Sequence, residues 1–149
     1  MLGICFGGQL LAAAHGGSVA ASPSPEIGWA TVESDDESVV PGGPWFEWHY
    51  DRWTLPPGAV EVARNGAASQ AYVLRRNLAV QFHPEVTPSL LAGWLANGGA
   101  EQVSDPAALL SRTWAEMPRA AERTRRLIDG FAASAIRDRD PYRRPRSRR

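Results

Sequence analysis

Lysine is absent from this chain, and all sixteen basic residues are arginine. A phosphate-binding loop of the type that carries an essential lysine is therefore excluded, and with it ATP-dependent synthesis through such a loop. No apolar run approaches the ~18–20 residues of a membrane span. The N-terminus also lacks the basic and apolar regions of a signal peptide. These absences predict a protein that does not insert in a membrane.

Sulfur and imidazole groups are scarce. A single cysteine, Cys5, cannot form an internal disulfide, which fits a reducing cytoplasm. The three histidines and Cys5 show no i, i+3 or i, i+4 spacing, so neither a metal site nor a bound cofactor is predicted. Chemistry at Cys5 would then be that of a free thiol.

Length and composition are those of one globular domain. The 149 residues are 44% hydrophobic and 21% charged, and the formal net charge is zero. Residues 1–111 carry a net charge of −7, whereas residues 112–149 carry +7. Seven arginines fall in residues 137–149, where apolar side chains are almost absent. This composition favours a disordered, solvated tail over a nucleic-acid-binding segment, for which the salt dependence of binding would be the test.

The stretch 3–9, Gly-Ile-Cys-Phe-Gly-Gly-Gln, runs into the apolar residues 10–14. This pattern predicts a strand end, a tight turn and a helix. Small residues two before and two after a nucleophile let the strand and helix approach closely, and the turn lifts the side chain out of the sheet edge. The helix N-terminus favours negative charge on the sulfur. We therefore predict a nucleophile at Cys5 rather than a buried small hydrophobe.

A second motif, His83-Pro84-Glu85, follows a strand-like run at residues 78–82. A cysteine nucleophile usually works with an imidazole that a third group orients, so His83 is the predicted base. Glu85 can point to the same side as His83 if the chain stays extended, and would hold the ring. Considered alone, His83 could be a structural histidine at the end of a strand, and Glu85 a surface carboxylate in contact with solvent.

Together and in this order, the two motifs resemble those of the class I glutamine amidotransferase family, and in particular the amidotransferase subunits of GMP synthases. The resemblance covers residues 1 to about 97. It implies a flavodoxin-like α/β fold, a mixed sheet with flanking helices, of which the first βα units are missing. It also implies glutamine as the substrate, with a thioester formed at Cys5 and ammonia passed to a synthase subunit or domain.

The resemblance further assigns residues around the nucleophile. The backbone N–H of Phe6, directly after Cys5, is one expected donor to the oxyanion; the second belongs to an N-terminal loop of the family that this sequence lacks. Gln9 matches a glutamine that helps hold the substrate. Tyr50 and Asp51 occupy a segment whose backbone contacts the substrate, with Tyr50 in place of a glycine. That replacement is expected to narrow the pocket or change the preferred substrate.

We expect three parts along the chain: residues 1–99, the later part of an amidotransferase domain; residues 100–136, a helical extension; and the tail, residues 137–149. The turn and cap residues predict the following elements. Strands are expected at 18–21, 26–33, 60–64, 69–74 and 78–82, with a loop at 22–25, and helices at 8–15, 88–96, 106–117 and 119–136, the last two separated by Pro118.

Two alternatives to a glutamine amidotransferase remain open. γ-Glutamyl hydrolases and γ-glutamyl-polyamine hydrolases share the predicted triad, and they release an amine or an amino acid instead of ammonia. A catalytically silent fragment would serve only as an interaction module. Its exposed sheet edge would then favour a homo-oligomer or aggregation.

Overall fold

The computed structural model describes residues 1–136, so the predicted tail at 137–149 lies outside the described residues. The elements follow in chain order. They are β1 (Leu2–Ile4), α1 (Phe6–Ala14), β2 (Ser18–Ser34), β3 (Gly43–Thr54), β4 (Val60–Arg64), β5 (Ser69–Leu74), β6 (Asn77–Val80), α2 (Pro88–Ala96), a 3₁₀ turn (Gly99–Gln102) and α3 (Pro106–Ile136).

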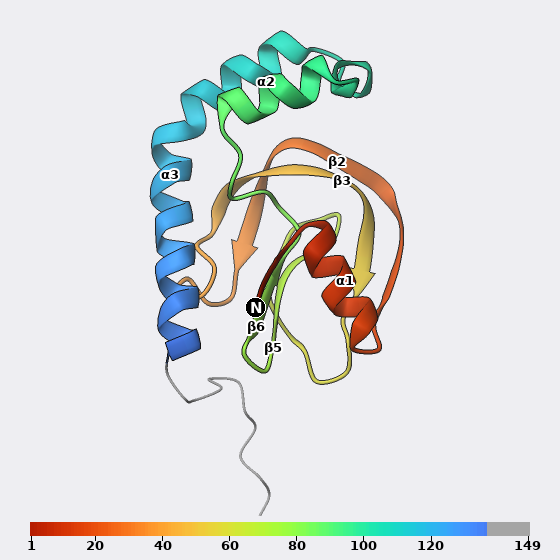
Figure 1. The fold of residues 1–149 in the computed structure, drawn as a ribbon, viewed down its shortest axis with the longest axis vertical. Coiled ribbons are helices and arrows are strands. Elements are labelled where there is room, and N and C mark those ends of the chain that lie inside the picture. The colour runs from red at the N-terminus through yellow and green to blue at the C-terminus, as the bar shows by residue number, and fades with distance from the viewer. Residues whose placement is uncertain (137–149) are drawn as a thin grey trace, which may run out of the picture.

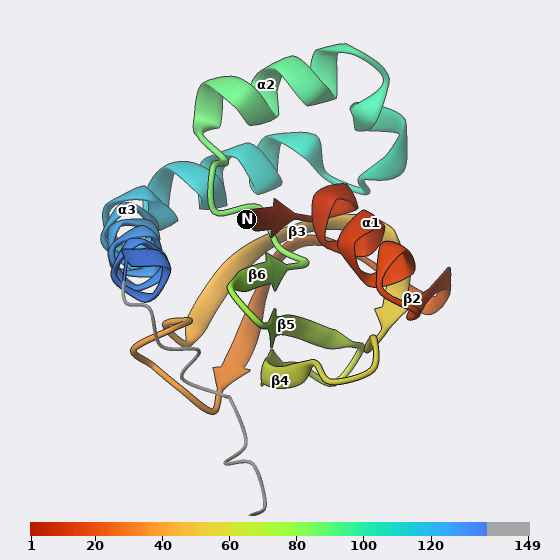
Figure 2. The same cartoon turned by 60° about the horizontal axis from the view of Figure 1, so that its bottom comes forward.

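Six strands form one mixed sheet in the order β1-β6-β5-β4-β2-β3. The pair β1 and β6 is parallel, and the other pairs are antiparallel. Figures 1 and 2 show the two long strands β2 and β3 curving around the shorter ones, so that the sheet is curled. The predicted α/β class with a mixed sheet is confirmed. The parallel part, however, is confined to the pair of strands that end beside Cys5.

The long hairpin of β2 and β3 corrects one prediction. Residues 22–25, Ser-Pro-Ser-Pro, were expected to form a loop, but β2 continues through them. The pairing register shifts here: Ala21 lies opposite Asp51, whereas Glu26 lies opposite His49. A bulge of this kind leaves residues unpaired, and prolines are tolerated there because no ladder hydrogen bond needs their missing N–H.

The third helix corrects another prediction. Pro118 was expected to separate two helices, but α3 continues through it. A proline inside a helix removes one hydrogen bond and crowds the preceding turn, which bends the helix without ending it. Figure 1 shows this bend between the early part of α3, near α2, and the later part, beside the sheet. No helix in residues 1–136 is long and apolar enough to cross a membrane.

Helices α1 and α3 lie on opposite sides of the strands in both views (Figures 1 and 2). Helix α1 packs Leu11 and Ala12 against Trp53 and Tyr72. Helix α3 places Leu127, which is fully buried, in the main strand cluster. Helix α2 adds Leu91 to a third cluster. This packing fixes the ends of β1 and β6, where the two predicted catalytic motifs begin.

Candidate active site

Cys5 occupies the turn between β1 and α1, as the sequence predicts. Its backbone angles, φ 46° and ψ −108°, fall in a region that residues other than glycine rarely adopt. Two hydrogen bonds hold it there. The Cys5 N–H donates to the Val80 carbonyl at 2.8 Å, and the Gln9 N–H donates to the Cys5 carbonyl at 3.0 Å. Strained backbone of this kind is typical of functional sites.

Glycines around Cys5 allow β1 and α1 to pack closely, but the two glycines that this packing requires are not both the ones that the motif indicated. A Cβ at Gly3 would lie 2.8 Å from the Gly7 carbonyl oxygen. A Cβ at Gly8 would lie 2.9 Å from the Trp53 ring. At Gly7 a Cβ would meet nothing within 4 Å. The close packing therefore requires Gly3 and Gly8, whereas Gly7 contributes the backbone that Gly3 faces.

His83 and Glu85 form a pair. The Nδ1–H of His83 donates to a Glu85 carboxylate oxygen at 2.6 Å, and the His83 backbone N–H donates to Phe46 at 2.7 Å. The imidazole meets Trp94 edge to face, with centroids 5.2 Å apart. Burial disfavours the charged ring, but the Cys5 sulfur and the Glu85 carboxylate outweigh it and raise the pKa of His83 to about 9. His83 Nε2 is buried without a hydrogen-bond partner among residues 1–136, which leaves it available for proton exchange.

Gln81 is the neighbour of Cys5 to which sequence reasoning gave no role. Its Nε2 lies 3.6 Å from the Cys5 sulfur, and its side-chain oxygen accepts a hydrogen bond from Gln9 Nε2 at 3.4 Å. Gln81 is fully buried. The spacing could have indicated this contact, because Gln81 and His83 are two residues apart at the end of a strand and share a face.

Cys5 and His83 line one cavity of about 620 Å³. Trp48 from β3 and Trp94 from α2 give it two aromatic walls, with ring centroids 5.6 Å apart. Gln102 of the 3₁₀ turn lines it as well. A largely apolar cavity with a few convergent polar groups is the usual form of a small-molecule site.

The remaining predicted site residues lie around this cavity without lining it. The amide nitrogen of Gln9 donates to the Asp51 carbonyl at 3.2 Å. The Tyr50 hydroxyl donates to Gln102 Oε1 at 2.7 Å, and the Asp51 side chain is exposed. Phe6 is the first residue of α1, where helix N–H groups have no intrahelical partner. Substrate contacts by Gln9, Tyr50 and Asp51, and the oxyanion role of Phe6, stay predictions.

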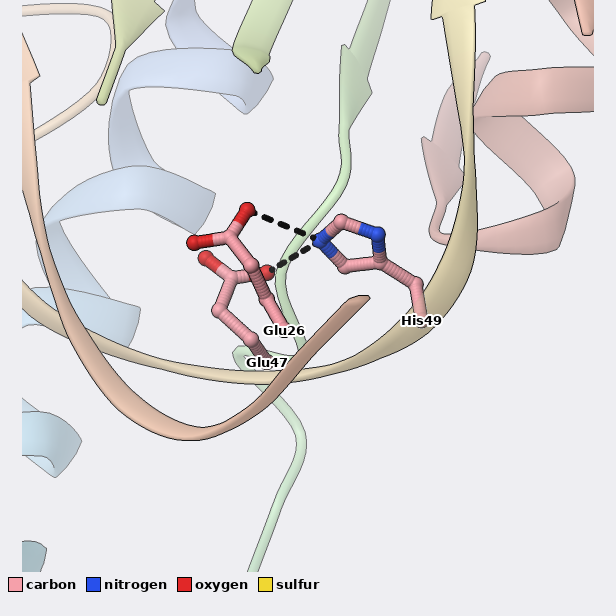
Figure 3. Close-up of side chains that lie close together, drawn as sticks. All are labelled: Glu26, Glu47 and His49. Carbon is pink, nitrogen blue, oxygen red and sulfur yellow. Dashed lines mark ion pairs between the residues drawn. The ribbon is translucent and has the colours of Figure 1, made fainter. Parts of the chain in front are cut away.

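His49, which the sequence ranked below His83 as a base, faces a different set of groups. Its Nδ1 lies 3.0 Å from the Asp51 carbonyl, and its Nε2 lies 3.3 Å from both Glu26 and Glu47 (Figure 3). Burial disfavours the charged ring, but the two carboxylates raise the pKa of His49 to about 10. His49 does not line the cavity that holds Cys5.

Comparisons with known proteins place the chain and its fold in a family. The family "Glutamine amidotransferase class-I" matches residues 1–99. The structure is also similar to that of a glutamine amidotransferase from Thermotoga maritima, with a TM-score of 0.78 and 28% identity over 87% of this chain and 61% of that one. A glutamine amidotransferase from Methylobacillus flagellatus gives the same TM-score and identity, over 97% of this chain and 66% of the other. The chain belongs to the class I glutamine amidotransferase family.

Among curated proteins, the chain is similar to GMP synthases. It is 35% identical to a glutamine-hydrolysing GMP synthase from Aeropyrum pernix over 125 residues, which span 74% of this chain and 24% of the relative. It is 39% identical to one subunit of a glutamine-hydrolysing GMP synthase from Sulfurisphaera tokodaii, over 57% of this chain and 50% of the relative. The chain thus matches half or less of the length of these two relatives.

Proposed function

We propose that this chain hydrolyses the side-chain amide of glutamine through a thioester at Cys5 and supplies ammonia to a synthase subunit or domain. The observation that carries the proposal is the strained turn at Cys5, which opens on the same cavity as His83 while Glu85 holds the other side of the imidazole. Membership of the amidotransferase family supports it, as does the similarity to one subunit of a glutamine-hydrolysing GMP synthase.

The first half of the reaction uses the free nitrogen of His83. Because Nδ1–H is donated to Glu85, Nε2 is the atom that takes the Cys5 proton. The sulfur attacks the amide carbon of glutamine, and the carbonyl oxygen becomes an oxyanion that the Phe6 N–H can stabilise. The C–N bond then breaks, His83 Nε2–H protonates the departing nitrogen, and ammonia leaves with the γ-glutamyl thioester still on Cys5.

Water completes the cycle. His83 Nε2, now neutral, removes a proton from water as its oxygen attacks the thioester carbon. The tetrahedral intermediate collapses, the C–S bond breaks, and glutamate leaves while the sulfur regains a proton from the imidazolium. Glu85 keeps its hydrogen bond to Nδ1 throughout, which fixes the ring orientation and stabilises its charged form.

A second candidate is hydrolysis of a larger γ-glutamyl amide by the same residues. The volume of the cavity favours it, since about 620 Å³ lies within the range of roughly 300–1,000 Å³ typical of drug-sized ligands. The aromatic walls from Trp48 and Trp94 suit an apolar amine as the leaving group.

Release of glutamate and ammonia by the purified chain, incubated with glutamine, tests the proposal. Equal amounts of both products are expected, and Cys5→Ser or His83→Ala should lower the rate by more than ~10³-fold, because nucleophile and base act as a unit. His15→Ala is the matched control: this exposed histidine at the end of α1 should be dispensable.

The same assay with γ-glutamyl-p-nitroanilide separates the two candidates. A kcat/KM higher for glutamine than for the anilide supports the amidotransferase, and the reverse order supports the γ-glutamyl hydrolase. Absence of product from folded chain with both substrates, with folding checked by circular dichroism, would leave the silent interaction module. Activity that survives Cys5→Ser would contradict the thioester mechanism.

A further inference from the structure

Glu26, Glu47 and His49 form a buried cluster apart from the Cys5 cavity (Figure 3). Glu47 and His49 lie two apart on β3 and share a face, and Glu26 is the cross-strand partner of His49 on β2. One ligand atom from each residue lies within 4.8 Å of the others. Sequence reasoning missed this cluster because it considered only the i, i+3 and i, i+4 spacings of helices. Glu47 and His49 share a face through strand alternation, and Glu26 reaches them because β2 pairs with β3 across 23 positions of sequence.

Glu47 is the member of the cluster whose buried carboxylate has no hydrogen-bond donor in the described part of the chain. Its side chain is 0% exposed, and neither carboxylate oxygen has a hydrogen-bond partner among residues 1–136. His49 Nε2 likewise makes no hydrogen bond within that part of the chain, although it lies 3.3 Å from a carboxylate oxygen of each glutamate. A charge-assisted N–H···O contact is normally shorter, about 2.7–2.9 Å. Buried carboxylates without a donor are costly unless another cation compensates them.

The distances suit a metal ion instead. Zinc binds imidazole nitrogen at about 2.0–2.1 Å and carboxylate oxygen at about 2.0–2.2 Å with tetrahedral geometry, which places adjacent ligand atoms roughly 3.3–3.5 Å apart. Both nitrogen–oxygen separations in the cluster, at 3.3 Å, agree with this edge length.

The surrounding hydrogen bonds also have the pattern of a metal site. His49 Nδ1–H donates to the Asp51 carbonyl at 3.0 Å, so Nε2 is the ring atom that faces the two carboxylates and would bind the metal in exchange for its proton. Glu26 accepts hydrogen bonds from Asn65 at 2.6 Å and from Gln70 at 2.8 Å. Two of the three candidate ligands are thus oriented by neighbours, as ligands of metal centres usually are.

We propose that Glu26, Glu47 and His49 bind a divalent first-row transition metal ion of the zinc type, with one coordination position left for water. Glu26 and Glu47 also line a neighbouring cavity of about 240 Å³. The nitrogen ligand favours Zn²⁺ over Mg²⁺, which prefers six oxygen ligands. The proposed metal site adjoins the segment predicted to contact the substrate. The backbone carbonyl oxygen of Asp51 accepts hydrogen bonds both from His49 and from Gln9.

Zinc binding to the full chain tests the site. The Cys5→Ser variant is the background, since the thiol and His83 could otherwise bind Zn²⁺ themselves. After loading with Zn²⁺ and removal of excess, elemental analysis should find one equivalent per chain. Competition with a chromophoric chelator should show at least tenfold weaker binding for Glu47→Gln and for His49→Gln. Glu33→Gln, an exposed glutamate on the same strand as Glu26, is the matched control and should bind as the background does.

Co²⁺ gives a readout that needs no substitution in the cluster. Four-coordinate Co²⁺ absorbs visible light far more strongly than six-coordinate Co²⁺, so addition of Co²⁺ to the Cys5→Ser chain should produce intense bands that Zn²⁺ abolishes and Mg²⁺ does not. Absence of these bands together with no retained zinc would overturn the proposal and leave a protonated histidine between two carboxylates. Equal zinc affinity in Glu47→Gln and in the background would overturn it as well.

Discussion

The side-chain amide of Gln81 lies 3.6 Å from the sulfur of Cys5, and its oxygen accepts a hydrogen bond from Gln9 at 3.4 Å. Gln9 in turn donates to the Asp51 carbonyl at 3.2 Å. Cys5, the proposed nucleophile, is therefore linked through two buried glutamines to the segment predicted to contact the substrate. An N–H directed at sulfur stabilises the thiolate more than the thiol, because the donor carries partial positive charge.

Gln81→Met should therefore slow alkylation of Cys5. Methionine keeps the length of the side chain but provides no donor, so the rate of reaction with iodoacetamide at pH 7 is expected to fall about 5-fold, equivalent to about 1 kcal/mol for one hydrogen bond. Gln70→Met is the matched control: Gln70 is also fully buried, but its amide donates to Glu26 and not to Cys5. Equal slowing in both variants would mean that the effect is a loss of packing.

The Glu85 carboxylate should set the alkaline limit of catalysis. The pKa of His83 is raised to about 9, so the imidazolium that is the proposed acid for the leaving ammonia persists at neutral pH and is lost as the pH rises through about 9. Glu85→Gln removes one group that favours the charged ring, and the descending limb of kcat/KM should move part of the way toward the ordinary histidine value of 6.5. We also expect a loss of roughly 10²-fold at the optimum.

A pH profile of glutamine hydrolysis for wild type and Glu85→Gln measures this shift. Glu101→Gln, at an exposed carboxylate of the 3₁₀ turn, is the control and should keep the wild-type limb. A lower rate in Glu85→Gln with an unmoved limb would show that the carboxylate holds the ring in place without affecting its protonation.

The two glycines nearest the nucleophile should differ in their tolerance of a methyl group. Gly3→Ala places a Cβ 2.8 Å from the Gly7 carbonyl oxygen, so we expect a loss of about 1–3 kcal/mol in the free energy of unfolding. Gly7→Ala meets nothing within 4 Å and removes a glycine from the first turn of α1, so stability should stay level or rise by up to about 1 kcal/mol. Urea unfolding of the two variants measures these changes. An equal loss of unfolding free energy in Gly3→Ala and Gly7→Ala would contradict this account of the turn.

Local patterns predicted much of this molecule because their causes are local. Thr87 caps α2 through its side-chain oxygen and Pro88 begins the helix, as both residue types favour. The pairing of His83 with Glu85 and the contact of Gly3 with Gly7 join residues close in sequence. The Glu26 and His49 contact could not be predicted in this way, since it depends on the register of two long strands across a bulge. The prediction that Pro118 ends a helix was wrong for a related reason. The packing of both halves of α3 outweighs the local cost of bending the helix at the proline.

A hydrogen bond between β2 and α3 should determine how firmly α3, which belongs to the predicted helical extension, is attached to the sheet. Trp29 Nε1–H donates to Thr113 Oγ1 at 2.9 Å, and both residues are buried. Thr113→Val has nearly the same shape but leaves the indole N–H without a partner, so we expect a loss of about 1–3 kcal/mol. In a Trp29→Phe background, where no N–H remains, the same substitution should cost less than half as much.

Urea unfolding of the four variants, followed by tryptophan fluorescence and far-ultraviolet circular dichroism, measures that coupling. Because Leu127 of α3 is fully buried among the strands, both probes should report a single transition at the same midpoint. Coupling near zero would mean that the indole N–H finds another partner when Thr113 is replaced. Two separate transitions would mean that residues 100–136 unfold independently of the amidotransferase domain, so that the extension could be removed without loss of the Cys5 site.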